Sequence, residues 1–110
     1  MKLSDLYALL HETGLPVTYG QFSGNAEDIP DPPYLVYYES RSDNMGADNV
    51  TYAQCLYVNV ELYTDCARDP GLERRVKKLL TGAGLYFETS HSDLPEEGVH
   101  ITYFEILLIE

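Results

Sequence analysis

The chain has 110 residues, an apolar content of 45% and a formal net charge of −11. One domain with a single core fits this length, and the ordinary apolar content means that the acidity does not indicate disorder. Only seven basic residues oppose eighteen acidic ones. This balance argues against a nucleic-acid surface that displaces counterions, so no sequence-specific nucleic-acid binding is expected, and against binding to an anionic membrane.

The amino-terminal segment is predicted to form a short amphipathic helix over residues 3–13, because four leucines recur there at helical spacing. Asp5 places a negative charge in the first turn, and Gly14 supplies a left-handed stop. Val17–Tyr19 should then form a short strand. Residues 21–33 contain three prolines within four positions, so we expect a surface loop there.

The stretch from Cys55 to Asp65 is predicted to be the central strand of a sheet. Leucine and valine occupy alternate positions, and tyrosine, asparagine and glutamate occupy the positions between them. Such alternation is typical of a strand with one buried and one wetter face. A slip of one residue would expose four aliphatic side chains, so the register should be well fixed. Residues 34–39 are apolar enough to form a second interior strand.

The segment between these two strands, residues 40–50, is polar and rich in turn-forming residues. It is longer than the usual loop of a hairpin. The excess length fits either an extended hairpin arm or a mobile functional loop. We expect a partner to order this segment, with Met45 as the anchor, because an exposed methionine fills irregular pockets well.

A second helix is predicted after residue 69. Asp69 suits the N-cap and Pro70 the first helical position, and Gly82 or Gly84 can end the helix. Its buried stripe should consist of Leu72, Val76, Leu79 and Leu80.

The remainder of the chain is expected to form a short strand over residues 85–89, a polar loop over 90–98 and a long final strand over 99–109. The resulting order is α-β-β-β-α-β-β. We therefore predict an α+β fold with a single domain over residues 1–110, in which a mostly antiparallel sheet is flanked by two helices.

No motif for catalysis is present, so the chain is not expected to be an enzyme or to hold a cofactor. His11, His91 and His100 fall on three different predicted elements, and none pairs with another at helical or strand spacing, so no metal site is expected. The sequence also lacks a nucleophile elbow, a Cys-x-x-Cys motif and a glycine-rich phosphate loop.

Cys55 and Cys66 are expected to be reduced thiols, because no secretory signal or transmembrane span is recognisable in the sequence. A disulfide between them is the alternative. In extended geometry, however, their Cα atoms would lie roughly 30 Å apart. A disulfide requires a separation below about 7 Å.

The basic residues are concentrated in one place. Five of the seven lie on or beside the second predicted helix, at Arg68, Arg74, Arg75, Lys77 and Lys78. This run fits an ordinary solvated helix face, which is the usual role of such runs. It also fits a basic patch on an acidic body, and two complementary surfaces of this kind suit a head-to-tail contact that closes into a ring.

Several short motifs carry a family resemblance over nearly the whole chain. After the leucine helix come Glu-Thr-Gly-Leu-Pro-Val, Pro-Pro-Tyr-Leu-Val-Tyr-Tyr, Ala-Asp-Asn-Val-Thr-Tyr, Val-Glu-Leu-Tyr-Thr-Asp, Leu-Glu-Arg-Arg-Val and Tyr-Phe-Glu-Ile. In this pattern the chain resembles the tail terminator or tail-completion proteins, which are encoded in the head–tail joining region of long-tailed phages and prophages of Gram-positive bacteria. The Ala47-Asp48-Asn49 turn and the strands around it match best.

The resemblance implies a non-enzymatic structural protein of the virion, assembled in the bacterial cytoplasm. Family members form a ring, commonly a hexamer, that caps the tail tube and joins it to the head connector or stopper. The partners implied are further copies of the chain, the tail tube protein and the connector. The candidate interface residues in this sequence are Arg41, Asp43, Asn44, Met45, Asp48, Asn49, Arg68, Arg74, Arg75, Lys77 and Lys78.

Two other classes of function remain open from the sequence. The high negative charge also fits an acidic inhibitor that mimics DNA and blocks a nucleic-acid-binding protein, although the basic helix does not. An enzyme of unrecognised class would need a deep pocket with convergent polar groups.

Overall fold

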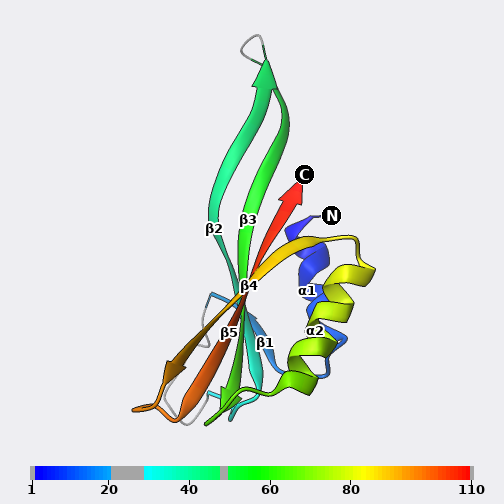
Figure 1. Ribbon diagram of the computed structural model, residues 1–110. Helices are drawn as coiled ribbons and strands as arrows, with labels where there is room; N and C mark the ends of the chain where they lie inside the picture. Colours follow the sequence, from blue (N-terminus) through cyan, green and yellow to red (C-terminus); the bar gives the residue numbers. More distant parts are fainter. Residues whose placement is uncertain (1, 21–28, 48–49, 110) are drawn as a thin grey trace.

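The structure is a computed structural model that describes residues 2–20, 29–47 and 50–109. Its element order is the predicted α-β-β-β-α-β-β, and the chain forms a single α+β fold (Figure 1). The elements are α1 (Leu3–His11), β1 (Val17–Tyr19), β2 (Tyr34–Ala47), β3 (Val50–Asp65), α2 (Pro70–Gly82), β4 (Tyr86–Leu94) and β5 (Val99–Ile109).

The strands form one five-stranded sheet in the order β1-β2-β3-β5-β4. β3 is the central strand, as the alternation from Cys55 to Asp65 predicts. Its neighbours β2 and β5 are both antiparallel to it, and β4 is antiparallel to β5. β1 pairs with β2 in parallel, so the sheet is mostly antiparallel.

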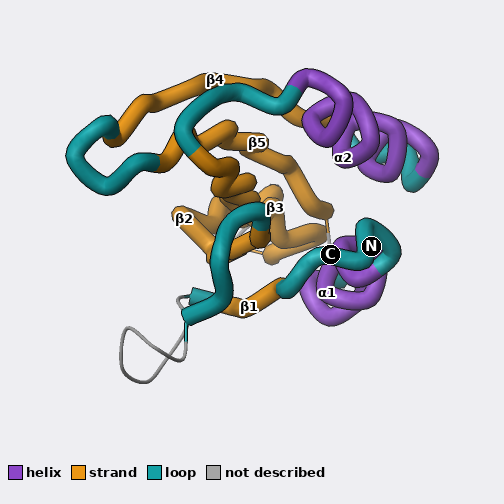
Figure 2. The backbone as a smooth tube through the Cα atoms, turned by 90° about the horizontal axis from the view of Figure 1, so that it is seen from below, coloured by secondary structure: helices purple, strands orange, loops and turns teal. Residues whose placement is uncertain are grey.

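The core lies between one face of this sheet and the two helices. Both helices pack on the same side of the sheet, which Figures 1 and 2 show from two directions. The aliphatic face of β3 is closed by these helices and is at most 5% exposed. In α2, Leu72, Val76 and Leu80 are buried as predicted, whereas Leu79 is only partly buried, which corrects the predicted stripe. Leu72, Val76 and Leu80 recur every four residues, and Glu73 occupies the remaining buried position.

The helix ends are formed by the predicted residues. Asp69 Oδ1 accepts a hydrogen bond from the backbone N–H of Leu72 at 3.1 Å, and Pro70 opens α2. Asp5 Oδ2 accepts from the backbone N–H of Lys2 at 3.0 Å at the start of α1. Gly14 follows α1 with a φ of 78°, the left-handed region that glycine reaches without strain.

Two strands are longer than predicted, and both additions are polar. β2 continues from Glu39 to Ala47, so the extended arm is the correct reading of residues 40–50. β4 continues from Thr89 to Leu94, which leaves only residues 95–98 as the connection to β5. Both extensions were predicted as loops because their residues are polar. Polar residues are compatible with strands at these places, since β4 is an edge strand and the β2 extension pairs on one side only.

The far ends of β2 and β3 form a two-stranded arm that extends beyond the rest of the sheet (Figure 1). β3 pairs with β5 from Cys55 onward, whereas in the described chain its residues 50–54 pair with β2 alone. Register shifts occur at residues 39–41 and 45–46, where they increase the local twist of a strand pair. The molecule is accordingly elongated, with principal extents of 51, 29 and 23 Å.

Candidate functional site

The five basic residues near α2 do not form one patch. Arg68 is bound to Glu73, with Nη2 to Oε1 at 3.0 Å and Nε to Oε2 at 3.2 Å. Arg75 Nη2 donates to the backbone carbonyl of Thr13 at 2.7 Å, which ties α2 to the end of α1. Two of the five predicted interface cations therefore have partners within their own chain.

The other three, Arg74, Lys77 and Lys78, form what we call the basic face. They lie at helical spacing on the side of α2 away from its buried stripe, where they line a shallow hollow of about 560 Å³ together with Thr81 and Gly82. Arg74 and Lys78 are exposed and Lys77 is half-buried. None of the three forms a salt bridge within the described ranges. Their charges are therefore available to another molecule.

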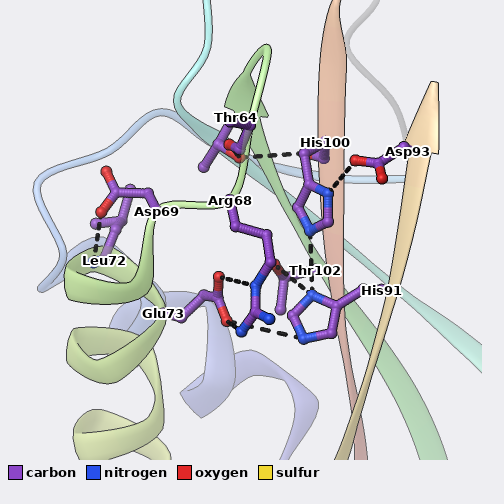
Figure 3. Close-up of polar contacts among 10 residues, drawn as sticks. Thr64, Arg68, Asp69, Leu72, Glu73, His91, Asp93, His100 and Thr102 are labelled. Carbon is purple, nitrogen blue, oxygen red and sulfur yellow. Dashed lines mark hydrogen bonds and ion pairs between the residues drawn. The ribbon is translucent and has the colours of Figure 1, made fainter. Parts of the chain in front are cut away.

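A group of polar side chains lies between the amino-terminal end of α2 and the strands β4 and β5, and we call it the polar cluster (Figure 3). Its members are Arg68, Glu73, His91, Asp93, His100 and Thr102. His100 Nδ1 lies 2.5 Å from Asp93 Oδ1, and His100 Nε2 lies 3.1 Å from His91 Nδ1. The expectation that no two histidines pair is therefore wrong. The antiparallel register opposes Asp93 to His100 and His91 to Thr102, so the two rings are diagonal neighbours.

Proton positions in the polar cluster follow from the partners of each ring nitrogen. An ionised Asp93 can only accept, which assigns a proton to Nδ1 of His100. Nε2 of neutral His100 then accepts from Nδ1–H of His91. If both rings were protonated, two N–H groups would point at each other.

Glu73 is the buried charge of the polar cluster, with a side chain only 2% exposed. Burial raises the pKa of Glu73, but the hydrogen bonds and charge of Arg68, with smaller contributions from His91 and Lys77, outweigh it, so the pKa lies below its ordinary value. His91 Nε2 is 3.8 Å from Glu73 Oε1, too far for a hydrogen bond. Glu73 is therefore an ionised carboxylate that is hydrogen-bonded to Arg68 and faces the ring of His91 on β4.

The surroundings of the polar cluster do not favour catalysis. Cys66 lines a hollow of about 420 Å³ beside Asp93 and His100. Its thiol donates to Asp65 Oδ1, and this hydrogen bond and charge raise the pKa of Cys66, whereas a catalytic cysteine has a lowered pKa. Both nitrogens of His100 are already engaged. In the portion of the chain described, no group of three His, Cys or carboxylate residues is placed to hold a metal ion.

The face of the sheet opposite the helices carries six of the ten tyrosines, and we call it the tyrosine face. It consists of Tyr34, Tyr38, Tyr57, Tyr63, Tyr86 and Tyr103, together with the glutamates Glu61, Glu88 and Glu105. In the strand registers these residues alternate with the core residues, so their side chains lie on the opposite face of the sheet. Among the described elements no helix covers this face (Figures 1 and 2).

Glu61 organises one half of the tyrosine face. It is 8% exposed and accepts hydrogen bonds from the hydroxyls of Tyr38 at 2.6 Å and Tyr63 at 2.7 Å. The ring of Tyr34 stacks on that of Tyr63 at a centroid distance of 4.7 Å. Burial, and then the hydrogen bond to Glu61, raise the pKa of Tyr63 well above its ordinary value. These contacts fix the rings in place before any partner arrives.

The predicted interface residues of the 40–50 segment lie along the arm. The guanidinium of Arg41 is 3.9 Å above the ring centre of Tyr57, so Arg41 borders the tyrosine face. Asp43, Asn44 and Met45 are paired through the backbone with Cys55, Gln54 and Ala53. Asp48 and Asn49 fall outside the described residues. The two cysteines are both free, as expected, with Cys55 buried and Cys66 exposed.

Sequence reasoning missed the polar cluster and the tyrosine face as units. The parity of β3 already separated Tyr57 and Tyr63 from the aliphatic residues, and this was the available signal. The partners of those tyrosines on β2, β4 and β5 depend on the strand order and registers, which the sequence does not specify.

The comparisons with known proteins give no family. No family model matches the chain, and no curated protein matches it in sequence. No helix among the described residues has the length and apolar character needed to cross a membrane.

Proposed function

We propose that this protein is a non-enzymatic structural component of the head–tail junction of a long-tailed phage or prophage. In this proposal it forms a ring, with six subunits as the resemblance implies, that caps the tail tube and joins it to the head connector. Its partners are further copies of itself, the tail tube protein and the connector or stopper. It acts in the virion, after assembly in the cytoplasm of the bacterial host.

The observation that carries this proposal is the arm formed by β2 and β3. An isolated two-stranded hairpin is marginally stable in water. Residues 50–54 nevertheless continue β3 well beyond the last residue that pairs with β5. An arm of this kind is suited to lie against a neighbouring subunit or the tail tube, which would supply the missing contacts. The candidate residues Asp43, Asn44 and Met45 lie on it.

The charge balance supports the same proposal. A channel through which DNA passes must not hold the phosphates tightly, and a chain with a net charge of −11 provides a repulsive lining. Within the described part of the chain, one hollow is lined by Cys66, Asp93 and His100, and the raised pKa of the Cys66 thiol does not suit a nucleophile.

The test is tube capping. Purified tail tubes assembled from the tube protein of the same genome should bind this protein at one end, as a ring visible by negative-stain electron microscopy. Deletion of residues 44–54, with a two-residue turn joining Asp43 to its strand partner Cys55, keeps the register and should leave a folded protein that caps poorly. Tubes that remain uncapped at saturating concentrations of the parent protein would refute the proposal.

An acidic inhibitor of a DNA-binding protein is the second candidate. The observation that favours it is the pair of exposed carboxylates Glu88 and Glu105 on a sheet face that no described helix covers. It predicts a basic host protein that binds this face and is displaced by duplex DNA. Binding that DNA does not displace would exclude DNA mimicry.

A further inference from the structure

We propose that the tyrosine face of one copy of this chain binds the basic face of the next copy, in a head-to-tail contact. This inference rests on the proposed ring and specifies the two surfaces that close it. Each surface alone has ordinary explanations. Together they show opposite charge and opposite orientation on the same molecule.

The tyrosine face has the composition of a protein-binding surface. Tyrosine is enriched at the centres of interfaces, because it offers a large rigid area and loses little conformational freedom on binding. Here the rings stand on strands, and they enclose two hollows. One, of about 390 Å³, is bordered by Tyr34, Tyr38 and Tyr63. The other, of about 280 Å³, is bordered by Tyr57 and Tyr86.

The charges on this face call for a cationic partner. Glu61 and Glu97 line the first hollow and Glu88 and Glu105 line the second, while the only cation lining either hollow is Arg41. Glu88 and Glu105 are directly opposite each other across β4 and β5. Like charges in that position repel. A cation bound between them would relieve the repulsion, and neighbouring tyrosine rings attract cations in addition.

The basic face supplies cations of the matching kind. Arg74, Lys77 and Lys78 project from a rigid helix and form no salt bridge in the described chain. Their aliphatic stems flank a hollow, which leaves apolar surface for an aromatic ring to contact. This geometry fits long cationic side chains that insert between tyrosine rings.

The two faces point in opposite directions, which determines the type of assembly. α2 packs on the covered side of the sheet with its basic face outward, and the tyrosine face is on the other side. When a surface of one copy binds a different surface, on the opposite side of the next copy, the contact cannot form a symmetric dimer. It produces a ring or a filament, according to the rotation between successive subunits.

The test uses two charge-reversed variants. Variant A carries Arg74→Glu and Lys78→Glu, and variant B carries Glu88→Lys and Glu105→Lys; all four residues are exposed, so both should fold like the parent. Each variant alone should associate on the order of 100-fold more weakly than the parent, because like charges then face each other. In a mixture, the acidic helix of A meets the basic sheet face of B, and the basic helix of B meets the acidic face of A. An equimolar mixture should therefore assemble with alternating subunits.

A matched control places the same charge change elsewhere. Lys2→Glu with Ser4→Glu and Ala8→Glu lowers the net charge by four at exposed positions of α1 and its N-cap, which is the same net change that variant A makes on α2. This control should assemble like the parent. Sedimentation velocity at high protein concentration provides the measurement for all variants and for the mixture.

Each other outcome overturns the inference in a recognisable way. If variant A assembles as well as the parent, the basic face is only solvated, although the ring proposal can stand through other surfaces. If A and B are both monomeric and their mixture stays monomeric, the two faces bind different partners. If the parent itself neither assembles nor caps tubes, both this inference and the proposed function are wrong.

Discussion

The two faces of the sheet are built from the same strands and are stabilised differently. On the covered face, Val58 and Val60 of β3 are fully buried against the helices. On the open face, Tyr57 and Tyr63 of the same strand remain half-buried, and hydrogen bonds and ring contacts hold the tyrosine face in place. Alternate residues of one strand thus encode a core and a preorganised surface. A surface that needed only to contact water would not require six tyrosines.

We expect a new charge to prevent folding on the covered face and to be tolerated on the tyrosine face. Val60→Asp places a carboxylate in a fully buried aliphatic site, which costs several kcal/mol or more, roughly the whole stability of a domain this size. We expect this variant to lose its cooperative thermal unfolding transition. The measurement is circular dichroism during a temperature ramp.

The adjacent residue is the matched control. Asn59→Asp introduces the same carboxylate one position along β3, on the tyrosine face, where it loses a long hydrogen bond to Tyr38 and lies opposite Glu105, and it should lower the free energy of unfolding by only about 1–2 kcal/mol. A soluble Val60→Asp protein that melts cooperatively near the parent temperature would contradict the assignment of the two faces.

The polar cluster at the edge of the covered face should give an intermediate effect. Arg68→Ala removes the partner of the buried Glu73 carboxylate and should lower the free energy of unfolding by about 1–3 kcal/mol near pH 7. Arg74→Ala is the control, because Arg74 is exposed and forms no salt bridge within the described residues, and its effect should lie within about 0.5 kcal/mol. Urea denaturation measures both.

The Arg68 effect should depend on pH. The pKa of Glu73 is lowered in the folded parent, so its contribution is present above the unfolded carboxyl pKa and is lost as the pH falls through the folded value. In Arg68→Ala, an unpaired buried Glu73 is protonated more readily. The stability difference between the two proteins should therefore shrink as the pH falls from 7 toward 4. A difference that is constant over this range would argue against an ionised Glu73.

The smallest effect is expected on the tyrosine face. Tyr63→Phe removes one of the two hydroxyls that donate to Glu61 and should cost about 1 kcal/mol, whereas Tyr86→Phe, at a site 65% exposed, should cost almost nothing. Because the pKa of Tyr63 is raised, its stabilising effect is present below the unfolded phenol pKa and is lost as the pH rises above it. Ultraviolet titration of Tyr63→Phe should lack one phenol whose pKa is raised in the parent. If the phenol that is missing from the variant has an ordinary pKa in the parent, the proposed role of Glu61 is wrong.

Strict periodicity made much of the fold predictable. The alternation from Cys55 to Asp65, the leucine helix and the capping pair Asp69 and Pro70 are local signals that agree with the final fold. The extensions of β2 and β4 were missed because their polar residues resemble a loop. Strand pairing, rather than local composition, makes those residues extended.

The candidate surfaces were less predictable than the fold, because they depend on contacts between distant residues. The cluster of five cations near α2 was visible in the sequence, but the bonds from Arg68 to Glu73 and from Arg75 to Thr13 were not. His91 and His100 meet only because β4 continues past Thr89 in register with β5. The same register brings Glu88 opposite Glu105 on the tyrosine face.

The most direct test of the central claim, a closed head-to-tail ring, is a native mass spectrum of the parent protein at high concentration in dilute ammonium acetate. The account predicts one dominant closed oligomer, six subunits if the family resemblance holds, that dissociates as salt rises because charges orient the contact. Exposed ion pairs contribute only about 0–1 kcal/mol each, so the tyrosine rings must supply most of the affinity and some oligomer should persist at moderate salt. A spectrum that contains only monomers, or only a salt-insensitive dimer, would contradict it.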